Sequence, residues 1–307
     1  MVVGIFGPTA SGKSEVAEAL ARLIPAELIS ADAMQVYRGL PILTNQSSHP
    51  TKLVAVWNLG HEASVAEYQD IAHEEVDAAL EAGKVPVVVG GTGLYLRAAL
   101  AGLRLPPRPP PGVRERYERL YNRLGGEQAH ALLATRDPTA AARLHPNDRR
   151  RVVRALELVE AGASLAPRGD TLWSGDYRRP TVVFGLDVPR AKLVERIEER
   201  TNRMLAAGVQ AEVRRALEQP LSETARMIHG LRDFAELPPS EAIESYNRRV
   251  RRYASYQRKW MRRIPGVVII DADRPVEEVA AEIHEVAGAR ERLPGDRKRR
   301  LDAGAGA

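Results

Sequence analysis

The chain has 307 residues, of which 44% are hydrophobic and 28% charged, so it is an ordinary globular sequence and not a disordered one. It contains no cysteine, which excludes disulfide scaffolds, thiolate zinc sites and cysteine nucleophiles, and no apolar run approaches the ~20 residues of a membrane helix. The formal net charge is +5, and 39 of the 45 basic residues are arginine, which favours either a phosphate-bearing partner or a GC-rich genome.

The first third of the chain alternates short apolar runs with segments of helical periodicity. Strands are predicted at 2–6, 27–30 and 85–89, and helices at 14–23, 65–82 and 94–100. Continuously apolar strands that alternate with helices are typical of a parallel sheet covered on both faces. Because the chain opens directly on a strand, we expect no secretory signal, and the absence of cysteine suits a cytoplasmic location.

A proline-rich segment at 105–112 interrupts this alternation. Helices alone are predicted after it, at 113–124, 126–134, 138–143 and 147–161. The α/β pattern then returns, with strands at 181–186 and 267–270 and helices at 190–206, 209–218, 222–236, 240–263 and 275–287. The expected domains are a core of residues 1–107 and 180–288, a helical insertion at 108–179 and a disordered tail at 289–307.

A glycine-rich loop with the sequence GPTASGKS lies between the first strand and the first helix. It matches G-x-x-x-x-G-K-[ST] in full, so its backbone N–H groups and Lys13 are expected to hold a polyphosphate or a diphosphate ester, and Ser14 to ligate Mg²⁺. The predicted fold is therefore an α/β, P-loop NTPase-like parallel sheet flanked by helices. The phosphate-binding residues of the loop are predicted to be Gly7, Pro8, Thr9, Ala10, Ser11, Gly12, Lys13 and Ser14.

Two further segments follow strands and should reach the same edge of the sheet. Asp32 follows the second strand, where a carboxylate could act as a general base or a Mg²⁺ partner, or could simply cap a helix. Thr92 lies in the turn GGTG after the third strand. That turn either adds N–H groups and the Thr92 hydroxyl to the crevice or serves tight packing.

The segments GPTASGKS, DAMQVYRG and GGTGLYL, in this order and spacing, resemble the tRNA dimethylallyltransferase family, also called the tRNA isopentenyltransferases. The resemblance extends over about residues 1–287. Further matching segments are HPNDRRRVVRALE at 145–157, FGLDVPR at 184–190, RIEERTNRMLAAG at 196–208 and RRYASYQRKWMRR at 251–263.

The resemblance implies transfer of a dimethylallyl group from dimethylallyl diphosphate to N6 of adenosine-37, 3′ to the anticodon of tRNA. It implies Asp32 as the general base, Thr92 at the target nucleotide, Arg200 beside the loop on the diphosphate, and Mg²⁺ as cofactor. The expected partners are the donor and the tRNA anticodon stem-loop, with no membrane and with a monomeric enzyme. Contacts to tRNA are implied for Ala33, Met34, Gln35, Arg114, Asn147, Asp148 and Arg151.

The arginines cluster in two places, which bears on the tRNA interpretation. Residues 108–154 hold 11 arginines against five acids, and residues 245–263 hold seven arginines and one lysine with no acid. Aromatic residues interleave the second cluster, as suits phosphate contact and base stacking: Tyr246, Tyr253, Tyr256 and Trp260. A solvated helix face with its aromatics in the core is the alternative, and for Trp260 we favour the core.

The chain also departs from the family pattern beside the predicted site, at Ala33, Gln46 and around His229, where changes in rate or tRNA choice are expected. Three other functions stay open at this stage. A small-molecule P-loop kinase would explain the loop and Asp32 but not the basic clusters, and a prenyltransferase of free adenine nucleotides would not need the insertion. An RNA-binding protein with a vestigial loop is disfavoured by the intact Lys13 and Ser14.

Overall fold

The computed structural model describes residues 1–106, 109–110, 112–166 and 172–292. The chain divides into two compact units, the first formed by Met1–Leu103 with the chain from Leu172 onward, and the second by Arg104–Thr171. The insertion predicted at 108–179 overlaps the second unit, but residues 172–179 belong to the first. Of the predicted tail, residues 289–292 continue the last helix, and residues 293–307 lie outside the described part of the chain.

The centre of the first unit is a five-stranded sheet in the order β2-β3-β1-β4-β5, with every pair parallel. Ile5 in the middle strand pairs with Val89 on one side and with Phe184 on the other. The predicted α/β parallel-sheet fold is thereby confirmed. The strands are β1 (Val2–Phe6), β2 (Ala26–Ser30), β3 (Val85–Gly90), β4 (Thr181–Asp187) and β5 (Val268–Asp271).

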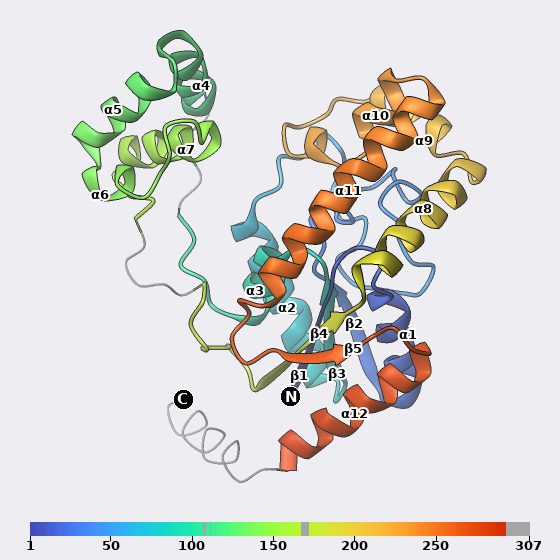
Figure 1. The fold of residues 1–307 in the computed structure, drawn as a ribbon. Helices are drawn as coiled ribbons and strands as arrows, with labels where there is room; N and C mark the ends of the chain where they lie inside the picture. The colour runs from blue at the N-terminus through green and yellow to red at the C-terminus, as the bar shows by residue number, and fades with distance from the viewer. Residues whose placement is uncertain (107–108, 111, 167–171, 293–307) are drawn as a thin grey trace. The chain divides into compact units, whose positions relative to one another are not determined.

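Helices cover both faces of this sheet, which is why its central strands β1 and β3 are apolar along their length (Figure 1). One set of alternate strand side chains, including Ile5, Val87 and Phe184, packs in a core with α1 (Lys13–Leu23) and α12 (Val276–Arg292). The opposite face lies under α2 (Val65–Glu81) and α3 (Gly93–Leu100), where Leu100 of α3 lies against Gly4.

A helical layer beyond β4 completes the first unit. It consists of α8 (Arg190–Ala206), α9 (Val209–Leu217), η1 (Ala225–Met227), α10 (Leu231–Glu236) and α11 (Pro239–Met261). The long helix α11 packs against α8, α10 and α3 (Figure 1). The single helix predicted at 222–236 is wrong, because Gly230 adopts a φ of 94° between η1 and α10, and an α-helix cannot continue through that conformation.

The second unit contains only helices in its described part: α4 (Val113–Leu124), α5 (Gly126–Arg136), α6 (Pro138–Ala141) and α7 (Arg149–Glu160). It has a small core of its own, in which Tyr117, Leu133 and Leu156 are buried. Tyr121 donates a hydrogen bond to the carbonyl of Pro146 at 2.7 Å and so ties α4 to the segment before α7. In the described residues of both units, no helix has the length and apolar character needed to cross a membrane.

Candidate active site

The glycine-rich loop follows the middle strand β1, from which the chain runs to β2 and β3 on one side of the sheet before it passes to β4 and β5 on the other. Such switch points place ligands at the carboxyl ends of parallel strands. Helix α1 begins at Lys13, so its N-terminal N–H groups open onto the loop. A cavity of about 270 Å³ lies here, lined by loop residues and by four arginines of α8 and the β5–α12 connection: Arg196, Arg200, Arg203 and Arg274.

Lys13 and Asp32 come together on the inner side of the loop. Burial lowers the pKa of the Lys13 ammonium, while the charge of Asp32 acts in the opposite direction and Arg200 again lowers it. Both residues line a second cavity together with Ser14, Glu18 and further polar side chains. The structure therefore brings together the lysine, the serine and the carboxylate that the sequence placed on separate segments.

Arg200 reaches the loop from α8. Its Nη1 donates to Thr9 Oγ1 at 3.0 Å, and its Nη2 lies 3.5 Å from the hydroxyl oxygen of Tyr246. Its Nε is buried and has no partner among the described residues, as is also true of the Ser11 hydroxyl in the loop itself. Buried donors without partners are rare in folded proteins, and the Arg200 side chain also lines the cavity beside the loop, where its charge would attract an anion.

Thr92 and Asp32 meet through the backbone of the segment after β2. Thr92 Oγ1 accepts from the N–H of Ala33 at 3.0 Å, and Asp32 Oδ1 accepts from the N–H of Met34 at 2.9 Å. Thr92 makes no side-chain cap to its own helix, α3, and its hydroxyl lies 3.5 Å from that of Tyr253 on α11. The residues directly after Asp32 form a turn and not an α-helix, so Asp32 does not cap a helix. Its side chain instead accepts the hydrogen bond from the N–H of Met34 in that turn.

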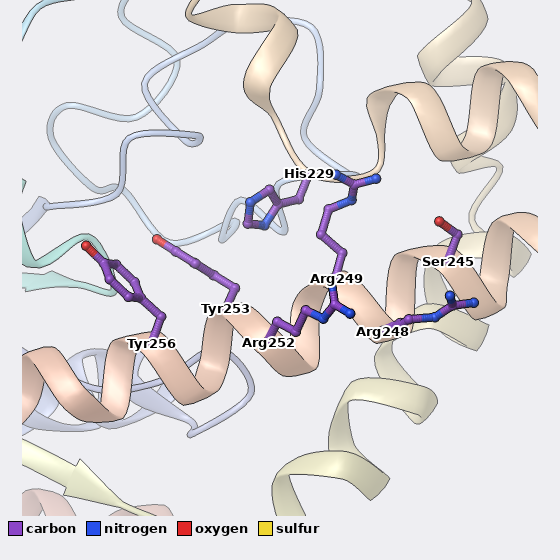
Figure 2. Close-up of a pocket in the computed structure, with 7 residues that line it drawn as sticks. All are labelled: His229, Ser245, Arg248, Arg249, Arg252, Tyr253 and Tyr256. Atoms are coloured by element: carbon purple, nitrogen blue, oxygen red, sulfur yellow. The ribbon is translucent and has the colours of Figure 1, made fainter. Parts of the chain in front are cut away.

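Basic and aromatic side chains of α11 form one wall of a pocket (Figure 2), and Tyr253 in this wall lies 3.5 Å from the Thr92 hydroxyl. His229 faces this wall from the turn before α10, with its ring edge-on to Tyr253 at 4.7 Å. Burial and the charge of Arg249 lower the pKa of His229, whereas the charge of Asp32 acts in the opposite direction. The carboxylate of Asp32 therefore interacts electrostatically with this side of the pocket. His229 and the wall together enclose a cavity of about 440 Å³, lined by His229, Ser245, Arg248, Arg249, Arg252, Tyr253 and Tyr256.

The aromatic residues of α11 divide between the core and the surface. Tyr246 is buried, whereas Tyr256 is 55% exposed. Trp260, for which we favoured the core, is only partly buried: its ring lies 4.6 Å from that of Trp173 and close against Gly93, the first residue of α3. From the sequence, His229 was noted only as a departure from the family pattern, and Gln257 was not singled out. Gln257 follows Tyr253 and precedes Trp260 in the sequence of α11, and it is buried.

The predicted tRNA contacts Ala33, Met34 and Gln35 lie on the partly buried segment beside Asp32. The Gln35 amide donates to the carbonyls of Thr44 and Asn45 at 3.2 and 3.0 Å and accepts from Ser30. Gln46, a departure from the family pattern, donates to the carbonyl of Tyr37 at 3.0 Å. Both amides hold this loop in shape, and the contact of residues 33–35 with tRNA stays a prediction.

The remaining predicted tRNA contacts belong to the second unit. Asp148 caps α7 by accepting from the N–H of Arg151 at 3.3 Å, and the Arg151 side chain is 69% exposed. The N–H of Asn147 is bonded to the ring of His145. Glu118 pairs with Arg114 at 3.3 Å and with Arg149 at 3.7 Å, which joins Arg114 to the start of α7.

In the described part of the chain, no cluster of three or more histidine, cysteine, aspartate or glutamate side chains could hold a metal ion alone. The oxygen atoms of Ser14, Asp32 and Glu18 around one cavity nevertheless fit Mg²⁺. This ion prefers hard oxygen ligands and usually takes one or two protein groups together with substrate phosphates. The donor set therefore suits a Mg²⁺ ion that a diphosphate helps to hold.

Comparisons with known sequences point in one direction. A model of the IPP transferase family matches residues 35–264. A protein of Salinispora tropica named tRNA dimethylallyltransferase is 41% identical over 284 residues, which cover 88% of each chain. A protein of Kineococcus radiotolerans with the same name is 41% identical over 285 residues, covering 87% of this chain and 89% of its own.

Solved structures agree. A tRNA isopentenylpyrophosphate transferase of Bacillus halodurans matches with a TM-score of 0.68 and 31% identity, covering 98% of this chain and 99% of its own. One from Staphylococcus epidermidis matches with a TM-score of 0.67 and 26% identity, covering 94% and 99%. A eukaryotic dimethylallyltransferase described as acting on tRNA shares the fold, with a TM-score of 0.70 at 24% identity over 88% of this chain and 73% of its own.

Proposed function

This chain belongs to the IPP transferase family of tRNA dimethylallyltransferases, and from that premise we propose that it prenylates N6 of adenosine-37 in tRNA with dimethylallyl diphosphate as donor. The observation that carries the proposal is one crevice that combines a phosphate-binding loop with a carboxylate. Lys13 and Asp32 line the same cavity, and Arg200 contacts the loop at Thr9.

The loop supports the departure of diphosphate. Negative charge develops on the diphosphate as the carbon–oxygen bond of dimethylallyl diphosphate breaks. Positive charge comes from Lys13 and Arg200, and hydrogen-bond donors come from Ser14 and from the N-terminus of α1 that follows the loop. Arg200 lines the cavity beside the loop and is held there by its bond to Thr9, which supports a role for its charge at the leaving group. We assign diphosphate binding to the whole loop, Gly7 to Ser14, with Arg200.

Asp32 supplies the other half of the reaction. The adenine N6 attacks the allylic carbon, the bond from that carbon to the diphosphate oxygen breaks, and the Asp32 carboxylate takes the proton that N6 loses. The Met34 N–H on Oδ1 and the Thr92 bond to Ala33 fix the segment that carries the carboxylate. The hydroxyl of Thr92 lies near Ala33 and Tyr253, which supports a contact of Thr92 with the target base.

Mg²⁺, held by Ser14 with Asp32 or Glu18 and the substrate itself, would neutralise part of the diphosphate charge when bound. The Arg and Tyr side chains of α11 suit the flipped nucleotide and its phosphates, since flipping costs a few kcal/mol that protein contacts must offset. The cytoplasmic location and the monomeric state stay predictions.

The deciding experiment incubates the protein with dimethylallyl diphosphate, Mg²⁺ and unmodified tRNA, followed by mass spectrometry of the digested nucleosides. The expected result is a dimethylallyl mass gain on the adenosine 3′ to the anticodon. Prenylation of free adenine nucleotides but not tRNA would contradict the tRNA assignment. ATP consumption with a small acceptor and no prenylation would favour a kinase instead.

A further inference from the structure

One buried glutamine joins three parts of the molecule that are distant in sequence. Gln257 of α11 is 2% exposed. Its Oε1 accepts from the N–H of Thr9 in the glycine-rich loop at 2.7 Å, and its Nε2 donates to the carbonyl of Gly91 at 2.8 Å. The side-chain amide therefore uses one acceptor and one donor to hold two backbone segments at fixed separation.

Both of those segments lead directly to groups in the crevice. Thr9 receives Arg200 on its side chain, so the loop residue that Gln257 holds by the backbone also places the arginine. Gly91 precedes Thr92, which holds the segment of Asp32 through the N–H of Ala33. Gln257 therefore contacts the phosphate loop directly at Thr9, and on its other side it is connected to Asp32 through Gly91, Thr92 and Ala33.

The fit around the amide is close. A Cβ added at Gly91 would lie 2.3 Å from Nε2 of Gln257, so the turn approaches the amide more closely than any other residue type would allow. The N–H of Thr9 is bonded to this amide and the N–H of Ser11 to the carbonyl of Pro8, whereas the start of α1 at Lys13 presents its first N–H groups to the loop. The backbone of Thr9 thus anchors the loop from which α1 begins.

We propose that Gln257 is a positioning residue: its amide sets the glycine-rich loop and the Thr92 turn in register, so that the diphosphate site and the acceptor site are preorganised together. This extends the proposed function, on which its catalytic part rests. The predicted effect of Gln257 on anion affinity does not depend on that function. Anion affinity depends on the geometry of the loop, whatever reaction follows binding.

The first test removes both hydrogen bonds with a side chain of similar length, Gln257→Met. We expect the affinity for Mg²⁺-pyrophosphate, measured by isothermal titration calorimetry, to fall about tenfold, the order of effect of one buried hydrogen bond. Gln69→Met is the matched control, since Gln69 also bridges backbone groups, the N–H and carbonyl of Leu103, but lies on α2 and does not line the cavities of the site. Its pyrophosphate affinity should equal that of the wild type.

The second test separates the amide's hydrogen bonds from simple packing. In Gln257→Glu, a protonated carboxyl can still accept from Thr9 and donate to Gly91, whereas an ionised one only accepts and repels the Gly91 carbonyl. Burial raises the pKa of a carboxyl, so the protonated form should persist toward neutral pH. The ratio of variant to wild-type pyrophosphate affinity should therefore approach one at low pH and fall as pH rises.

Wild-type affinity in Gln257→Met, or a flat pH ratio in Gln257→Glu, would overturn the proposal. If Gln257→Met fails to fold, as judged by its thermal midpoint against Gln69→Met, the pH ratio of Gln257→Glu decides alone. Single-turnover prenylation should follow the same order of variants. If the wild type binds pyrophosphate but prenylates no tRNA, the proposed function fails, and the pyrophosphate results still judge the role of Gln257.

Discussion

Asp32 shows how one side chain acquires its chemistry from its neighbours. It accepts a backbone hydrogen bond at Met34, shares a cavity with Lys13, and its charge reaches Tyr253 and His229. The Thr92 hydroxyl, bonded to the next residue along, fixes the backbone that carries it. A carboxylate so placed can take a proton without leaving its position.

Asp32→Asn keeps an oxygen for the Met34 N–H and removes the basic atom, so we expect it to retain tRNA binding and lose turnover. The single-turnover rate at saturating donor and tRNA should fall by about 10²- to 10⁴-fold, the usual contribution of a general base. A filter-binding measurement of tRNA affinity serves as the control. Loss of tRNA binding with an unchanged chemical step would contradict the assignment.

His229 predicts a pH dependence of stability. Burial, with Arg249, holds its folded-state pKa below the unfolded value, against the opposing charges of Asp32 and Asp233. The unfolded chain then takes up the proton more readily, so the stability is present above the unfolded pKa and is lost as pH falls below it. His229→Leu should lose less stability than the wild type in urea titrations between pH 7.5 and pH 5. Parallel losses in the two proteins would refute this.

Among the elements, the break between η1 and α10 places His229 over α11. Gly230 has a φ of 94°, and an added Cβ would lie 2.7 Å from Leu43 and 2.9 Å from Tyr246. The turn is thus fixed by backbone conformation and by packing at once. Periodicity cannot reveal such a break, because the apolar spacing continues across it.

Gly230→Ala should therefore destabilise the protein by about 1–3 kcal/mol for the strained backbone, plus a packing cost. Gly208→Ala is the control, since Gly208 has a φ of 87° but no atom within 4 Å of an added Cβ. Urea unfolding should give a larger loss for Gly230→Ala. Equal losses would mean that packing at Leu43 and Tyr246 adds nothing.

Helix α11 also resolves the two interpretations of its basic cluster. Four of its arginines form ion pairs: Arg248 with Glu244, Arg249 with Asp233, Arg251 with Glu198, and Arg258 with Asp187. Arg252, Lys259 and Arg262 form no ion pair within the described part of the chain, and all three are exposed. The helix therefore carries both paired arginines and exposed basic side chains without an ion pair, and phosphate binding by the second group stays a prediction.

At the scale of the whole molecule, the two units differ in what they contain. The first unit contains the crevice with the glycine-rich loop, and the second is a small helical unit rich in arginine. The second unit has its own buried cluster, so its surface charges are held by a defined scaffold. Long-range attraction of tRNA phosphates to such a surface depends on salt through counterion release.

Arg151→Ala should weaken tRNA binding and lower the slope of log affinity against log salt by about one, as expected for one lost phosphate contact. Arg116→Ala is the matched control in the same unit, because Arg116 forms a hydrogen-bonded ion pair with Glu160, whereas Arg151 is 69% exposed and lies 3.6 Å from Asp148. Binding isotherms at several salt concentrations give both slopes. An unchanged slope for Arg151→Ala would remove that residue from the tRNA surface.

The sequence alone determined the parallel α/β sheet and the phosphate loop, because both follow from local pattern. Apolar runs at β1 and β3 and the GPTASGKS motif encode conformations that depend on neighbours only a few residues away. The position of Asp32 at the carboxyl end of β2 followed from the same rule of parallel sheets.

Only the tertiary structure decided how these parts are tied together. Gln257 and Thr9 are 248 residues apart, Arg200 and Thr9 are 191 apart, and Tyr253 and Thr92 are 161 apart. Hydrogen bonds at such separations depend on where α8 and α11 cross the sheet edge, and no local periodicity carries that information. The position of the phosphate loop relative to the Asp32 carboxylate is therefore determined by tertiary packing.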